Sequence, residues 1–133
     1  MSKGAEPVWV DPSVVDIIHH EQIIEHGGTT GLRDSGMLES ALQRPFQTWQ
    51  YQDPPADLCE LAAAYAHSLA KNHPFLDGNK RTAAIVCELF LNLNNRVFTV
   101  DEVAKYPHYL ALAAGEESME DFTTWLREVT EEV

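Results

Sequence analysis

Two long apolar segments on either side of a polar connection constrain the fold of this chain more than any other feature. The segment from Asp57 to Lys71 and the segment after Gly78 both repeat apolar residues every three or four positions, which is the period of a helix. The first is also rich in alanine, the strongest helix former. The sequence therefore predicts two largely buried helices, the second ending at Asn94, joined by a polar loop that starts at His73.

The residues before these helices predict another helix behind a short tail. Residues 1–10 are expected to form an N-terminal tail with a short extended piece. Asp11 is a good N-cap and Pro12 suits the first helical position. The helix that follows carries an apolar stripe and is expected to end at Gly27, because glycine accepts the backbone angles of a helix end.

The next part of the chain predicts a short helix and then a surface loop. Asp34 or Ser35 can cap this helix. Pro45 is expected to close it, because the residue before a proline is pushed out of the helical region. Residues 46–55 are polar, aromatic and rich in turn formers, and we expect a surface loop there with a little strand at 48–51.

Two more helices are predicted in the last third of the chain. Thr99 and Glu102 have the spacing of a capping box, so a helix is expected from about residue 100 to residue 114, ending at Gly115. Ser118 is a weaker cap for the last helix. No segment alternates convincingly between apolar and polar residues, and the fold class is therefore all-α, with about six helices and the polar loop between the two central ones.

Composition narrows the class of protein. A chain of 133 residues fits a single domain spanning 1–133. The formal charge of −12 argues against nucleic acid or an anionic membrane as a partner, so anion binding has to be local. Cys59 and Cys87 lie in apolar helical patterns and are expected to be reduced and buried. Without an apolar leader or membrane span, the chain is expected to be cytoplasmic.

The polar loop carries the residues of a phosphate site. The first amides of a helix lack internal partners and attract anions, and Lys80 and Arg81 add positive charge there. Asp77 is a hard oxygen ligand suited to magnesium, and His73 can take a proton from a hydroxyl near neutral pH. This combination favours phosphoryl or nucleotidyl transfer from a magnesium nucleotide. The other five histidines, which are read as structural for lack of metal-type spacing, are His19, His20, His26, His67 and His108.

The loop sequence from His73 to Arg81, His-Pro-Phe-Leu-Asp-Gly-Asn-Lys-Arg, resembles the signature of the Fic/Doc family, specifically its Doc (death-on-curing) branch. The resemblance extends to Gly27–Gly28, Leu32–Asp34, Leu38–Pro45 and Ala114–Glu116, so that it covers nearly the whole chain. It implies a small, all-helical toxin of a toxin-antitoxin pair. A cognate antitoxin would inhibit it in trans with a helix, since neither inhibitory-type segment in this chain, at Glu39 or Glu128, completes the family's pattern.

The resemblance also assigns roles within the loop. It implies that His73 is the general base, that Asp77 binds Mg²⁺, and that Asn79 and the Gly78 backbone bind phosphate. Phe75 would be the buried anchor that holds the shape of the loop.

Two further residues bear on the reaction. Lys80 stands where nucleotidyl-transferring members have a second glycine, which implies that ATP binds in the other direction and delivers its γ-phosphate, with Arg81 clamping the phosphates. The implied substrate is a threonine hydroxyl of elongation factor Tu, whose modification blocks translation. Pro74 and Gly78 are closer to the nucleotidyl-transferring motif, so AMP transfer to a protein hydroxyl is the alternative, and a non-catalytic nucleotide- or protein-binding module is the third reading.

Overall fold

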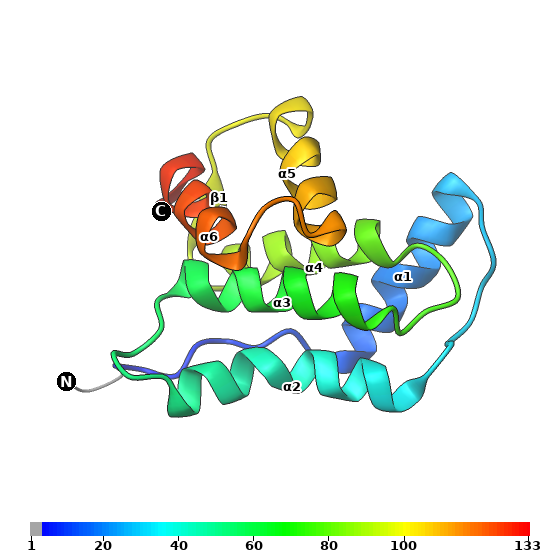
Figure 1. The fold of residues 1–133 in the computed structure, drawn as a ribbon, viewed down its shortest axis with the longest axis horizontal. Helices are drawn as coiled ribbons and strands as arrows, with labels where there is room; N and C mark the ends of the chain where they lie inside the picture. The colour runs from blue at the N-terminus through cyan, green and yellow to red at the C-terminus, as the bar shows by residue number, and fades with distance from the viewer. Residues whose placement is uncertain (1–3) are drawn as a thin grey trace.

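A computed structural model describes residues 4–133, and in that range the chain forms six helices and one two-stranded sheet (Figure 1). This confirms the predicted all-α class. The elements are α1 (Pro12–His26), α2 (Ser35–Tyr51), α3 (Leu58–Asn72), α4 (Asn79–Leu93), β1 (Arg96–Phe98), α5 (Glu102–Ala114), α6 (Met119–Val129) and β2 (Thr130–Glu132).

Helix α3 is the centre of the core. Of its fifteen residues, ten are buried, because α2 packs along one side and α4, α5 and α6 pack on the others (Figure 1). Alanine at five of these buried positions lets neighbouring helices approach closely. Helix α1 packs against α4, which brings α1 next to the loop between α3 and α4 (Figure 1). The two helices that flank the predicted site, α3 and α4, are therefore each held in place by several neighbouring helices.

Three predicted helices have the expected bounds. Helix α1 begins after Asp11, whose carboxylate accepts the Ser13 N–H, and it ends before Gly27. Helix α3 begins after Asp57 and helix α4 after Gly78. Cys59 and Cys87 are buried and form no disulfide, as predicted. Within residues 4–133, no helix is long and apolar enough to cross a membrane.

Helix α2 corrects the prediction that Pro45 ends a short helix. The helix continues to Tyr51 with Pro45 inside it. A proline leaves the carbonyl four residues earlier without its helical donor, which here is the carbonyl of Ala41. The Ser68 hydroxyl of α3 donates to that carbonyl at 2.8 Å. Because a neighbouring helix supplies the missing donor, the proline is tolerated.

The predicted strand at 48–51 and the predicted loop over residues 46–51 were wrong for the same reason, because α2 continues to Tyr51, whereas residues 52–55 do form a connection without helix or strand. Phe46 and Trp49 lie on this helix and make ring contacts with Trp9, which also stacks on Phe90 in the core. Part of the expected tail is thus held in place by aromatic packing. Val10 is buried, and its N–H donates to the Tyr65 hydroxyl.

The region after α4 holds two further differences from the prediction. Asp101, rather than Thr99, caps α5, because the Asp101 carboxylate accepts the Ala104 N–H at 3.0 Å. The Thr99 hydroxyl instead donates to the carbonyl of Val129. Strands β1 and β2 pair antiparallel, with Phe98 opposite Thr130, and the sequence pattern did not predict them.

Candidate active site

One open cavity at the α3–α4 loop brings together the polar residues that the sequence singled out. The cavity encloses about 340 Å³. Six of the predicted site residues line it, together with Leu76, Tyr106 and Leu110: His73, Asp77, Gly78, Asn79, Lys80 and Arg81. Phe75 packs beneath the loop and is only 3% exposed.

His73 sits at the end of α3 in a left-handed backbone conformation, with φ 47° and ψ 55°. Such a conformation is uncommon for a residue other than glycine and persists only where the surroundings hold it. Arg33 supplies that hold. Its guanidinium donates to the carbonyl of His73 at 2.6 Å and to the carbonyl of Asn72 at 2.7 Å. Its backbone N–H donates to the carbonyl of Pro74. These bonds also satisfy carbonyls at the end of α3 and leave the His73 side chain exposed.

The centre of the loop is braced from below by Asn79. Its side-chain oxygen accepts the Phe75 N–H, and its amide donates to the Phe75 carbonyl, both at 3.0 Å. Asn79 is 8% exposed, so its side chain is committed to the loop while its backbone N–H belongs to the first turn of α4. Leu32 forms an isolated bridge to Phe75. The turn is therefore held to both α4 and the segment before α2.

The carboxylate of Asp77 lies between the turn and the α1–α2 connection. One oxygen accepts the Gly78 N–H at 2.9 Å, and the other accepts the Thr29 N–H at 3.3 Å. Gly28 passes so close that an added Cβ would lie 2.6 Å from that second oxygen. Asp77 itself is exposed. Its orientation is therefore set by backbone groups, while both oxygens keep lone pairs for a ligand.

Helix α4 begins at the cavity with two adjacent positively charged side chains. Its N-cap is Gly78, and no side chain caps its first amides. Lys80 and Arg81 follow, both exposed, and residues 4–133 supply no ion pair to either. Cations are unfavourable at a helix N-terminus. An anion at this helix start would be stabilised by the uncapped amides and by both cations.

Residues from the α1 side complete the site and were not found from the sequence. Besides Thr29 and Arg33, His19 of α1 contacts the loop directly: its Nε2 lies 2.8 Å from the Asp77 carbonyl and its ring stacks on Phe75. The sequence predicts only a structural role for His19, without this contact. The one available signal was its place on the buried face of α1, four residues before Ile23.

Comparison with known proteins identifies the class. A model of the Fic/DOC family matches residues 9–91, more than half of the chain, including α1 and the whole loop. The chain therefore belongs to the Fic/Doc family.

Two similar proteins both carry the name Doc. The protein "Toxin Doc" of Mycolicibacterium smegmatis is 41% identical over 78 residues, which cover 59% of this chain and 60% of that protein. The protein "Protein kinase doc" of Escherichia phage P1 is 33% identical over 119 residues, which cover 89% of this chain and 92% of that protein. The likeness to the phage protein thus extends well beyond the loop.

Proposed function

We propose that this protein is a Doc-like toxin that transfers the γ-phosphate of ATP to a threonine hydroxyl of another protein, with elongation factor Tu as the first candidate substrate. The observation that carries the proposal is the single cavity that His73, Asp77, Lys80 and Arg81 share at the uncapped start of α4. The names of the two relatives, a toxin and a protein kinase, support the same reading.

In this proposal each residue has a distinct task. The imidazole of His73 takes the proton of the acceptor hydroxyl. The hydroxyl oxygen then bonds to the γ-phosphorus, the bond from that phosphorus to the β–γ bridging oxygen breaks, and ADP leaves with the bond's electrons. The first amides of α4 and the Arg81 guanidinium hold the phosphate oxygens, and Lys80 adds a point charge.

The donor set fits a magnesium ion carried by the nucleotide better than a resident metal. Within the described residues, no group of three or more histidine, cysteine, aspartate or glutamate side chains could hold a metal. Asp77 is the single carboxylate that lines the cavity, and a magnesium ion commonly combines one or two carboxylates with phosphate oxygens and water. When bound, the ion would neutralise charge that develops on the phosphates.

AMP transfer remains the second candidate, because Pro74 and Gly78 match the nucleotidyl-transferring motif. Lys80 opposes it, since its side chain occupies the cavity lining where a glycine would leave room for the α-phosphate. A binding module without catalysis is the third candidate, and a His73→Ala variant that keeps its full cellular effect would favour it.

An antitoxin partner follows from the likeness to Doc toxins, and we propose that it inhibits through an apolar helix. A groove between α2 and the segment before α1 has a suitable lining that includes Trp9, Leu38, Leu42 and Phe46. Expression of this protein alone should arrest growth, and co-expression of its antitoxin should relieve the arrest. Harmless expression alone would contradict the proposal.

The deciding experiment is intact-mass analysis of elongation factor Tu after incubation with this protein, ATP and Mg²⁺. His73→Ala tests the base, and His20→Ala, an exposed histidine on α1, is the matched control. We expect one phosphate increment that is lost only with His73→Ala. A nucleotide increment would favour AMP transfer. No increment on elongation factor Tu would reject it as the substrate.

A further inference from the structure

His19 contacts the active-site loop at the peptide bond that joins Asp77 to the N-cap of α4. The acceptor is a backbone carbonyl, which cannot donate, so Nε2 of His19 must carry the proton and donate to the Asp77 oxygen at 2.8 Å. The His19 side chain comes from α1, and the residue as a whole is 5% exposed. A buried donor from a separate helix thus holds one peptide plane of the site.

That peptide plane controls the Asp77 carboxylate. In a trans peptide the carbonyl and the N–H point in opposite directions. With the carbonyl directed at His19, the N–H of Gly78 points the other way, and it donates to Asp77 Oδ1 at 2.9 Å. The hydrogen bond from His19 therefore fixes the direction of the donor that orients the carboxylate. The same peptide leads directly into the first amides of α4.

The His19 ring holds the turn in a second way. It stacks on Phe75 with the ring centroids 3.7 Å apart and the planes 8° from parallel. It also lies under Gly78, where an added Cβ would be 3.7 Å from His19 Cδ2. The ring thus fills the space beneath the turn from Phe75 to Gly78, and rotation of that peptide would have to displace a buried side chain.

We propose that His19 is a positioning residue of the active site, which holds the Asp77–Gly78 peptide so that the carboxylate and the α4 N-terminus face the phosphates together. A histidine that only stabilised the fold would not couple to ligand binding. The part of the proposal that concerns nucleotide binding rests on the proposed function, whereas the order of the ligand-free turn does not.

The test compares two substitutions of His19 with one control. His19→Phe keeps a ring to stack on Phe75 but has no donor, and His19→Gln keeps an N–H donor but has no ring. His20→Phe changes the exposed neighbour on the same helix. Amide hydrogen exchange of the ligand-free proteins reports the order of residues 76–80, and calorimetric titration with ATP, with and without Mg²⁺, reports binding.

We expect exchange in residues 76–80 of His19→Phe to be faster by about tenfold, the usual effect of one lost buried hydrogen bond. Its affinity for ATP should fall by about fivefold or more with Mg²⁺ present and by less without it, because the carboxylate serves the metal. His19→Gln should recover most of both losses, and His20→Phe should match the wild type.

Unchanged exchange and affinity in His19→Phe would overturn the proposal. A loss in His19→Phe spread evenly over the whole chain, in proportion to a lower melting temperature, would also overturn it, because the role would then be structural. If His19→Phe does not fold, ¹⁵N spectra of the wild-type imidazole decide: protonation at Nε2 is expected, and protonation only at Nδ1 would overturn it. If the wild type binds no ATP, the proposed function fails while the exchange data still test His19.

Discussion

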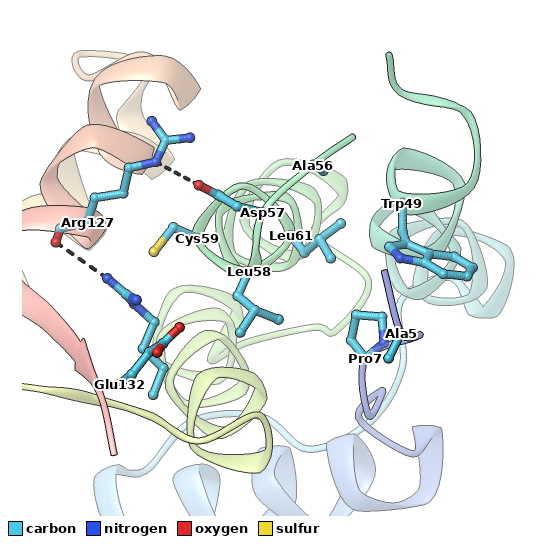
Figure 2. Close-up of a pocket in the computed structure, with 11 residues that line it drawn as sticks. Ala5, Pro7, Trp49, Ala56, Asp57, Leu58, Cys59, Leu61, Arg127 and Glu132 are labelled. Carbon is cyan, nitrogen blue, oxygen red and sulfur yellow. Dashed lines mark hydrogen bonds and ion pairs between the residues drawn. The ribbon is translucent and has the colours of Figure 1, made fainter. Parts of the chain in front are cut away.

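The starts of α3 and α4 are built from the same kinds of residues but differ in how those residues are used. Each start has an aspartate just before the helix, positively charged side chains nearby, and a cavity of about 310 Å³ at α3 and 340 Å³ at α4. Figure 2 shows the α3 cavity, in which Arg127 points at Asp57. Sequence composition alone would make these two places equivalent.

The charged groups at the start of α3 are paired within the protein. Asp57 and Glu60 form a complete capping box. Arg127 donates to Asp57 at 2.9 Å and to Glu60 at 3.2 Å, and the Asp57 carboxylate raises the pKa of Arg127. At α4, by contrast, Gly78 leaves the first amides uncapped. The comparison teaches that residue types alone do not distinguish the two places, whereas the partners of their charges and amides do.

Removing one arginine from each cavity should give opposite results. Arg81→Ala should weaken ATP binding with Mg²⁺ by about 2 kcal/mol, the usual value for a charge-assisted hydrogen bond, with little change in stability. Arg127→Ala should leave binding unchanged and lower the free energy of unfolding by about 1 kcal/mol, because its ion pairs are partly exposed. Calorimetry and urea unfolding measure the two effects, and equal binding losses would break the comparison.

Adjacent glycines beside the α4 site allow a matched test of the Asp77 position. Gly28→Ala would place a Cβ 2.6 Å from the Asp77 carboxylate, whereas Gly27→Ala meets nothing within 4 Å. Both have positive φ, so each should cost about 1 kcal/mol of stability or more, with the larger cost for Gly28→Ala because of its close contacts. Only Gly28→Ala should also weaken ATP binding with Mg²⁺, by about tenfold, as measured by titration. Equal binding in the two variants would show that the carboxylate position does not matter.

Removing the cap of α3 should affect stability alone. Asp57→Ala deletes the acceptor for the Glu60 N–H and one partner of Arg127, and we expect a loss of about 1 kcal/mol in the free energy of unfolding. Activity under folded conditions should stay at the wild-type level. A drop in phosphate transfer without unfolding would mean that the two helix starts are coupled.

Thiol labelling should distinguish the buried cysteine at the α3 cavity from an exposed position at the α4 cavity. Cys59 lines the α3 cavity at 3% exposure, and burial raises the pKa of its thiol above the ordinary value of 9.0. At pH 8 less than about a tenth of it is thiolate, and the labelling rate should rise as the pH increases through that raised pKa. A Leu76→Cys variant in the open cavity should label at least about threefold faster and be protected by ATP with Mg²⁺. Equal rates would contradict the difference in burial.

The bounds of α1, α3 and α4 could be predicted because their determinants are local. Caps and apolar period lie within the segments themselves. The continuation of α2 through Pro45 involves Ser68, which is 27 residues from Ala41 in the chain. Strand β1 pairs with β2, which lies beyond both α5 and α6 in the sequence. No local pattern can report such distant donors and partners, so these elements were missed.

The same distinction applies to the site. The polar residues that line the cavity could be named because they lie in one short stretch, where a turn followed by a helix brings them together, whereas Tyr106 and Leu110 of α5 could not. The groups that hold the turn come from elsewhere: His19 acts across 58 positions, Thr29 across 48 and Arg33 across 40. What each lining residue does in a reaction stays a prediction until the transfer is measured.

The left-handed backbone of His73 has a consequence for how this gene would decay. Glycine accepts that conformation without strain, so replacing His73 by glycine should leave the protein about 1 kcal/mol more stable while removing the proposed general base. Most mutations that inactivate a protein also weaken it, but here inactivity and stability change in the same favourable direction. In a host that is harmed by the activity, mutation of His73 to glycine would therefore give a folded but inactive protein. Retention of His73 would then require continued selection for the activity.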